Sequence, residues 1–380
     1  MKAPIKTNNF DLIRLLAAVQ VVAHHAIDHL GLDRHSGLVG LIAQLIRFFP
    51  GVPIFFFVSG FLISKSYESS PSVLDYARNR VLRIYPALVI CTLVSVGAVF
   101  ALDYLPRAGV SLRDVAVWML AQMTVVQFYN PDFMRAFGVG VLNGSLWTIT
   151  VELQFYLVTP LVYALFGLRH RRGTLPLLLL SLALLAPNLA YWHADPENHP
   201  GMALKLLGVT FLPWYYMFLV GVLAQRHFHW LHQWLSGRAI YVCASYVVAS
   251  LLATRYLGWG ASNDIHPALY VLLAACVFSL AYTWPTLADR LLHRQDISYG
   301  IYIYHMPCIN VLLYVGLKSQ PISLAFTFAA TLLMALLSWI AIERPCLLLK
   351  RGGLGHSPLP IGPLAGQAAP AAVTATGEPP

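Results

Sequence analysis

The sequence predicts an all-α integral membrane protein, a helical bundle of about ten transmembrane helices. Its 380 residues are 58% hydrophobic and only 11% charged, whereas a soluble domain carries about 25% charged residues. The apolar residues also fall in blocks of about 20, the length that an α-helix needs to cross a bilayer. This composition excludes a simple soluble enzyme, a disordered chain and a nucleic-acid-binding protein with a basic surface.

The first apolar block covers residues 10–30 and follows Lys2 and Lys6. It is long for the apolar part of a secretory leader and carries His24 and His25, so we expect a retained helix. Nine further blocks of similar character cover residues 41–64, 86–103, 145–166, 174–192, 203–224, 239–257, 268–284, 297–317 and 321–343.

An eleventh segment, residues 112–129, is interrupted by Asp114, Gln122 and Gln127. If it does not cross and the N-terminus is cytoplasmic, sixteen of the 25 basic residues lie on the cytoplasmic side and seven lie outside. That asymmetry is the positive-inside rule, and it accounts for the net charge without nucleic acid as a partner. If the segment crosses, the basic cluster at 169–172 moves outside. We therefore expect ten spans, both termini cytoplasmic, and residues 112–129 re-entrant or on the outer surface.

The composition changes after Arg351. We expect residues 1–351 to form the membrane domain, and residues 352–380, rich in Gly, Pro and Ala, to be a disordered tail. The five cysteines form no C-x-x-C pair and mostly lie inside apolar blocks, so we interpret them as small buried hydrophobic side chains, not as disulfides or metal ligands. They are Cys91, Cys243, Cys276, Cys308 and Cys346.

Arg14 and His25 are ionisable residues within the first span, where a charge is costly and function is the default hypothesis. Their separation of eleven residues places both on one helix face, about 16 Å apart along the axis. One face would then offer an anion anchor toward the cytoplasm and an acid–base group deeper in the membrane. The alternative is an arginine that reaches the membrane surface and an interior histidine with a structural role. His24 points about 100° away.

Three arginines, Arg78, Arg80 and Arg83, follow one another in the segment YARNRVLRIYP. Arg80 and Arg83 are neighbours on one helix face, and paired guanidinium groups suit phosphate oxygens. Their cytoplasmic placement is right for a donor that carries a nucleotide. The alternative is that this run is simply the strongest positive-inside signal.

Glu152, in GSLWTITVELQFYL, is the third candidate and lies near the outer end of its predicted span. A carboxylate at that depth needs a partner or a function. It would orient a histidine, bind a hydroxyl group or hold two helices together.

Three further residues are weaker candidates, and each favours a structural role. Ser59 precedes Gly60 in a segment suited to close helix packing. His305 comes two residues before a proline, where its side chain would satisfy backbone groups that the proline frees. Glu343 is expected to pair with Arg344. None of these patterns predicts a metal site.

The segments that carry these candidate residues, in their order and spacing, resemble those of the membrane-bound acyltransferase family 3. This family includes bacterial O-antigen, exopolysaccharide and peptidoglycan O-acetyltransferases. The resemblance covers about residues 8–345. It is carried by FDLIRLLAAVQVVAHH, FFPGVPIFFFVSGFLISKS, RNRVLRIYPAL, GSLWTITVELQFYLVTPLV, and SYGIYIYHMP followed by SWIAIERP.

The resemblance assigns roles to residues of this chain. It implies that His25 is catalytic and that Arg14, at the family's ten-residue spacing, belongs to the same site. Arg80 and Arg83 match an R-x-x-R linked to acyl-CoA binding, and Glu152 matches the acidic residue of the family's S-L-x-x-x-x-E segment.

Two positions depart from the family pattern. Leu15 follows Arg14 where glycine is frequent, and Tyr304 replaces the tryptophan of a W-H-x-P motif. These departures bear on positioning or substrate choice.

The implied reaction moves an acyl group, acetyl by default, from cytoplasmic acetyl-CoA or another acyl-CoA to a hydroxyl of a cell-surface or lipid-linked glycan. It would occur in the bacterial inner membrane, without a permanently bound cofactor. Direct transfer and an acyl-histidine relay both stay open. The alternatives are a secondary transporter, which would be expected to show two related halves, and a non-catalytic component of a polysaccharide assembly complex.

Overall fold

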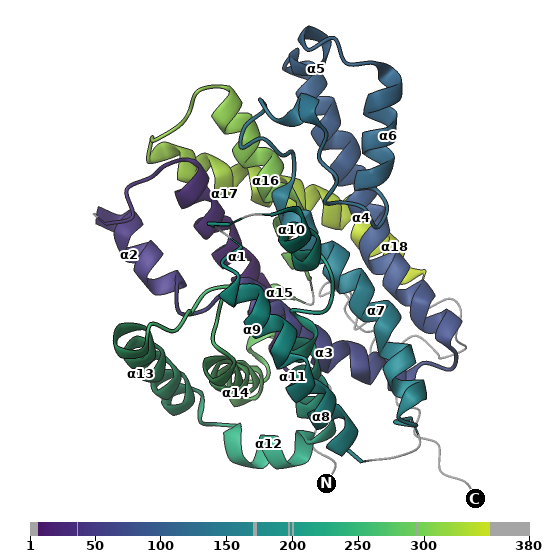
Figure 1. Cartoon of the computed structure of the whole chain (residues 1–380), viewed down its shortest axis with the longest axis vertical. Coiled ribbons are helices and arrows are strands. Elements are labelled where there is room, and N and C mark those ends of the chain that lie inside the picture. Colours follow the sequence, from purple (N-terminus) through teal and green to yellow (C-terminus); the bar gives the residue numbers. More distant parts are fainter. Residues whose placement is uncertain are drawn as a thin grey trace, which may run out of the picture.

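The computed structural model describes residues 7–35, 37–169, 173–196, 198–199, 201–293 and 295–349. Within these ranges every regular element is helical (Figure 1), which confirms the predicted all-α class. The predicted tail, residues 352–380, lies outside the described residues.

The longer helices form the body of the bundle. They are α1 (Phe10–His29), α2 (Gly37–Ile46), α3 (Gly51–Ser69), α4 (Val73–Ala101), α6 (Leu112–Gln122), α7 (Trp147–Leu165), α11 (Tyr215–Arg226), α13 (Ala239–Leu257), α14 (Pro267–Thr283), α16 (Ser298–Tyr314) and α17 (Ile322–Ser338). The shorter ones are α5 (Tyr104–Arg107), η1 (Asp132–Met134), η2 (Gly144–Leu146), α8 (Leu175–Ala183), α9 (Leu185–His193), α10 (Met202–Gly208), α12 (Phe228–Leu235), α15 (Leu287–Leu292), η3 (Trp339–Glu343) and α18 (Arg344–Leu348).

Seven helical runs in the described part of the chain are long and apolar enough to cross a bilayer. They correspond to seven of the predicted blocks and establish a multi-pass membrane protein. The runs are Phe10–His29, Gly37–Ser69, Val73–Ala101, Gly144–Leu165, Leu175–His193, Ala239–Leu257 and Ile322–Leu348.

The other three predicted blocks are helical but shorter or interrupted. Blocks 268–284 and 297–317 form α14 and α16, each of 17 residues. Block 203–224 is divided, because α10 ends at Gly208 and α11 begins only at Tyr215. Pro213, which has no N–H for a helix ladder, lies in that break.

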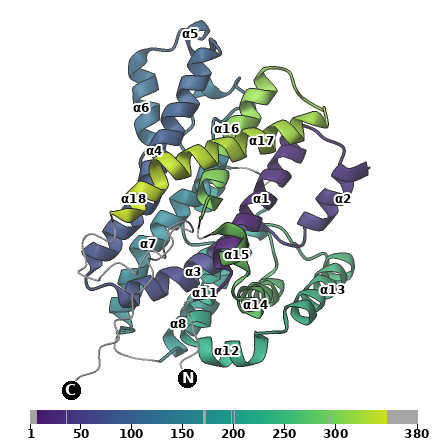
Figure 2. The same ribbon diagram turned by 180° about the vertical axis from the view of Figure 1, so that it is seen from behind.

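The centre of the bundle is the contact between α3 and α11, with α1 packed on α3 and α16 (Figures 1 and 2). Gly60 and Gly221 make the close approach possible. A Cβ at Gly60 would lie 1.9 Å from the carbonyl oxygen of Phe218, and one at Gly221 would lie 2.2 Å from that of Phe57. Small residues are what membrane helices use at such crossings, as predicted for the Ser59–Gly60 segment.

Pro307 interrupts the hydrogen-bond ladder of α16, and the freed group is the carbonyl of Ile303. Asn143 donates to this oxygen from Nδ2 at 2.7 Å, and the thiol of Cys91 approaches it at 3.3 Å. The prediction that His305 satisfies the groups freed by the proline is therefore wrong. Two residues from other parts of the chain satisfy this carbonyl and leave the imidazole available.

The interpretation of all five cysteines as unpaired is also wrong, because Cys243 of α13 and Cys276 of α14 form a disulfide. The two helices run side by side in opposite directions, which a separation of 33 residues does not reveal. Cys91, Cys308 and Cys346 are free, as predicted.

Candidate active site

Arg14 and His25 both reach toward α16, which places them on one face of α1 as their spacing predicts. Nη1 of Arg14 donates to Oδ2 of Asp296 at 2.7 Å, in the turn before α16. Nδ1 of His25 lies 2.8 Å from Nε2 of His305, within α16. Arg14, near the start of α1, pairs with Asp296 just before α16, and His25, farther along α1, pairs with His305 farther along α16. The two helices are therefore parallel.

The hydrogen bonds around His305 fix the proton positions of both imidazoles. Nδ1 of His305 lies 2.6 Å from the carbonyl oxygen of Tyr302. That oxygen only accepts, so Nδ1 carries the proton and Nε2 of the neutral ring is an acceptor. His25 must then donate from Nδ1, which leaves its Nε2 with a free lone pair. His305 is buried, whereas His25 is partly exposed. The pair thus presents one oriented basic nitrogen.

Asp296 holds two arginines from different helices. Besides Arg14 of α1, Arg83 of α4 donates from Nη2 to the same oxygen, Oδ2. The hydroxyl of Ser298 binds the other oxygen of the carboxylate. Burial opposes ionisation of Asp296, but the two guanidinium groups outweigh it, so the pKa of this carboxyl lies below its usual value. The cluster joins α1 and α4 to the start of α16.

Arg80 and Arg83 do not form the predicted pair. Arg83 faces Asp296, whereas Nη2 of Arg80 donates to Oγ of Ser66 on α3 at 3.2 Å. The Arg80 guanidinium also lies over the ring of Tyr156, 5.8 Å from its centroid. The reason is geometric: residues three apart differ by about 60° around a helix, so long side chains reach different neighbours. In this arrangement Arg80 and Arg83 do not point toward one common site, so they do not form a paired site for one phosphate.

Glu152 accepts two hydrogen bonds on one oxygen. The hydroxyl of Ser59 donates to Oε1 at 2.8 Å, and the hydroxyl of Tyr156 donates to it at 2.5 Å. The bond from Ser59 links α3 to α7, so Ser59 has a polar contact beyond its predicted packing role. The orienting group for His25 is His305, not Glu152.

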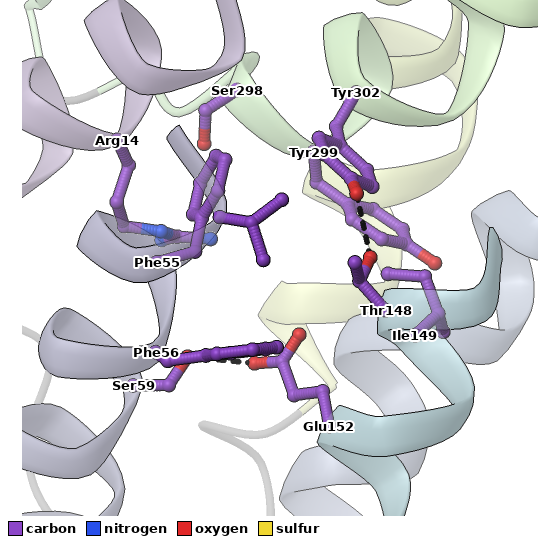
Figure 3. A pocket seen from close by; sticks show the side chains of 11 residues that line it. Arg14, Phe55, Phe56, Ser59, Thr148, Ile149, Glu152, Ser298, Tyr299 and Tyr302 are labelled. Atoms are coloured by element: carbon purple, nitrogen blue, oxygen red, sulfur yellow. Dashed lines mark hydrogen bonds between the residues drawn. The ribbon is translucent and has the colours of Figure 1, made fainter. Parts of the chain in front are cut away.

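A narrow cavity of about 40 Å³, which we call the central cavity, lies between Arg14 and Glu152, and neither His25 nor His305 is among the described residues that line it (Figure 3). Arg14, Ser59 and Glu152 supply polar groups to its wall, and the second oxygen of Glu152 points into the space (Figure 3). Tyr302 completes the wall, with its hydroxyl 2.6 Å from Oγ1 of Thr148. Because the carbonyl of Tyr302 binds His305, this residue connects the cavity to the histidine pair.

Sequence reasoning missed Asp296 and Tyr302. An aspartate immediately before an apolar block is a helix-start signal, and nothing in the sequence connects it to arginines on α1 and α4. Glu343 was also misplaced. It is buried and accepts a hydrogen bond from Ser338 at 3.1 Å, whereas its predicted partner, Arg344, is exposed.

Fold and site together define a multi-pass helical membrane protein with a pair of hydrogen-bonded histidines in its interior. The chain belongs to acyltransferase family 3: residues 7–343 match the family's acyltransferase domain. The predicted resemblance is confirmed, and the protein is an O-acyltransferase enzyme. This result decides against the transporter and scaffold alternatives.

Relatives of known name agree with this family. The chain is 32% identical over 360 residues to nodulation protein 10 of Rhizobium leguminosarum bv. viciae, covering 90% of this chain and 94% of that protein. It is 27% identical over 350 residues to the O-acetyl transferase of Shigella phage Sf6, covering 89% and 96%. A 178-residue match at 29% identity to O-acetyltransferase OatA of Staphylococcus aureus covers 43% of this chain and 25% of that protein. No solved structure gives a significant match.

Proposed function

We propose that this enzyme transfers an acetyl group from acetyl-CoA to a hydroxyl of a cell-surface or lipid-linked glycan, in the bacterial inner membrane. The observation that carries the proposal is the imidazole pair, in which His305 fixes the tautomer of His25 and leaves Nε2 of His25 free. A free, oriented imidazole nitrogen is what general-base catalysis of acyl transfer requires.

Ten crossings with cytoplasmic termini are part of the proposal. In addition to the seven long runs, α14, α16 and the pair α10–α11 would each cross. Parity supports this count, because α1 and α16 are parallel and an odd number of crossings must separate them. Seven do so without α6. The eleven residues of α6 would span only about 16 Å, too short for a hydrocarbon core of about 30 Å.

The donor would enter from the cytoplasmic end, where Arg80 lies near the start of α4. Arg14 and Arg83 are already paired with Asp296. We therefore assign them a structural role, which is to hold α1, α4 and the start of α16 together at the cytoplasmic end of the site. Arg80 has a serine and aromatic rings around it and remains the arginine best placed for a donor phosphate. The pantetheine arm is long and thin, and we place it between the helices whose side chains line the central cavity.

The reaction balances with one base. Nε2 of His25 takes the proton of the acceptor hydroxyl as its oxygen attacks the thioester carbonyl. The carbon–sulfur bond breaks, the thiolate of CoA leaves, and the imidazolium returns its proton to the sulfur. The products are an acetyl ester and CoA. During the step, His305 stabilises the charged His25 ring through the bond to Nδ1–H, as an orienting partner does in other histidine-based sites.

Glu152 would act in the cavity, through the oxygen that neither Ser59 nor Tyr156 occupies. That oxygen can accept a hydrogen bond from the pantetheine amides, which are the polar groups of the arm. Its proposed role is therefore to position the donor.

The test uses purified full-length protein in lipid nanodiscs, with acetyl-CoA as donor. The acceptor probe is the envelope polysaccharide of the source organism, freed of its O-acetyl groups by mild base. We expect acetyl transfer by the native enzyme and a loss of about 10³-fold in His25→Gln, within the range for a general base. The matched control is His24→Gln, on the neighbouring histidine, which points about 100° away from His25. Full activity in His25→Gln would remove this residue from the mechanism.

A further inference from the structure

A second cavity, which we call the turn cavity, has a volume of about 650 Å³ and lies between α9 and the turn at residues 258–266. This turn joins α13 to α14. Aromatic rings form part of the wall, namely those of Trp192, His193, Trp259 and His266. The volume is within the range of small-molecule sites, about 300–1,000 Å³. Nothing in the proposed chemistry of His25 accounts for this cavity.

The rings of the turn cavity are held in place before any ligand arrives. The indole of Trp259 stacks on the imidazole of His266, with centroids 3.6 Å apart and planes 12° from parallel. Both side chains are half-buried, and Trp192 and Trp259 pack against the main apolar core. The backbone closes the turn, because N–H of His266 donates to the carbonyl of Gly260 at 3.1 Å. A rigid aromatic surface loses little conformational entropy when it binds.

Polar groups flank this aromatic surface. Nδ1 of His266 accepts from N–H of Ala268 at 3.3 Å, so a neutral His266 carries its proton on Nε2 and is a donor there. The carboxylate of Asp264 is exposed, and its Oδ1 accepts from N–H of Ser262 at 3.0 Å. Oδ2 lies over Gly260, where a Cβ would come within 2.1 Å of it. Glycine at this position leaves room for the carboxylate.

The turn also reaches the catalytic end of the bundle. Ser262, within the same turn, lines a third cavity of about 370 Å³ together with Gln20, His24 and Asp28 of α1. His24 immediately precedes His25. One side of the turn therefore faces the turn cavity. The other side faces α1, which carries the proposed base His25, at the end of α1 that is farther from Arg14.

We infer that the turn cavity binds a sugar unit of the acceptor glycan, a claim that rests on the proposed function and specifies its acceptor. The apolar C–H face of a pyranose packs on a flat indole, while its hydroxyls pair with a carboxylate and an N–H donor. Among the described residues that line the cavity, none is Lys or Arg. The lining thus favours a neutral hydroxylated ligand over a phosphate or another anion.

The experiment separates acceptor binding from the reaction. Binding of the de-O-acetylated envelope polysaccharide to the full-length enzyme in nanodiscs is measured by calorimetry without acetyl-CoA. We expect Trp259→Ala and Asp264→Asn to weaken binding at least tenfold, whereas Trp259→Phe, which keeps a flat ring, stays within about threefold of the native enzyme. With acetyl-CoA present, the KM for the polysaccharide should rise to match, with kcat and the KM for acetyl-CoA unchanged.

The matched control is Trp230→Ala, an exposed tryptophan on α12, which lies at the start of α13 and so at the other end of that helix from the turn. Equal polysaccharide binding by native enzyme and Trp259→Ala would overturn the inference, as would absence of binding to the native enzyme. Failure of the proposed function is distinct. In that case the native enzyme binds the polysaccharide, loses this binding in Trp259→Ala, and transfers no acetyl group.

Discussion

Nδ1 of His25 donates to Nε2 of His305 across 2.8 Å, although 280 residues separate them in the sequence. On the other side of the ring, Nδ1 of His305 donates to the carbonyl oxygen of Tyr302. The three groups form a directed chain in which one backbone carbonyl determines the tautomer of both rings. A buried imidazole here performs the orienting role that a carboxylate or a backbone carbonyl has beside many other functional histidines.

Replacing His305 with Phe should lower kcat for acetyl transfer about 10- to 100-fold, the usual cost of losing an orienting partner. The ring volume is kept, but the acceptor for Nδ1–H of His25 is lost. The KM for acetyl-CoA should not change, since His305 lies behind His25. His305→Gln, whose amide oxygen still accepts, should recover part of the loss. A rise in KM with unchanged kcat would contradict a positioning role.

Arg80 and Arg83 should respond differently to substitution with Ala. Arg80→Ala should weaken acetyl-CoA binding about tenfold, the value of one charge-assisted hydrogen bond, while the melting temperature stays near that of the native protein. Arg83→Ala should lower the melting temperature, since it removes a partner of a buried carboxylate, and bound acetyl-CoA per folded molecule should be unchanged. Binding is measured by calorimetry and unfolding by fluorescence in detergent. An equal loss of acetyl-CoA binding in both variants would contradict these separate roles and favour the prediction that Arg80 and Arg83 bind the donor together.

Part of this site follows from the sequence for a simple reason. Arg14 and His25 lie on one helix, so the helical period alone places them on one face. Their partners, Asp296 and His305, are about 280 residues away, and only the packing of α1 against α16 brings them near. Local geometry even misleads for Arg80 and Arg83, because neighbours on a helix can face different helices.

The fold shows the same division between local and non-local information. Apolar blocks such as residues 239–257 coincide with α13 because the bilayer requires one helix length of apolar residues. The break in block 203–224 coincides with Pro213, a local signal. The disulfide between Cys243 and Cys276 depends on which helices lie side by side, and it leaves no periodic signal in the sequence.

The stability of the protein should fall in acid through Asp296. The pKa of this carboxyl in the folded protein lies below its ordinary value, whereas in the unfolded chain it is about 3.9. The ion pairs with Arg14 and Arg83 therefore stabilise the fold fully above about pH 4, and this contribution is lost as the pH falls further toward the folded pKa.

Asp296→Asn is the variant that isolates this effect. It should lower the melting temperature at pH 7 and flatten the decline of the native protein between about pH 4 and pH 2.5. The measurement is thermal unfolding in detergent across that range. Parallel pH curves for the two proteins would show that Asp296 does not supply the acid sensitivity.

Gly60→Ala should destabilise the bundle at its centre. The new methyl group would lie 1.9 Å from the carbonyl oxygen of Phe218, so α3 and α11 must separate or distort, at a cost of about 2 kcal/mol or more. Gly97→Ala is the matched control, because the same substitution on α4 meets no atom within 4 Å and replaces a poor helix former with a good one. We expect a lower melting temperature for Gly60→Ala and an equal or slightly higher one for Gly97→Ala. Equal stability of both variants would mean that α3 and α11 do not depend on this close contact.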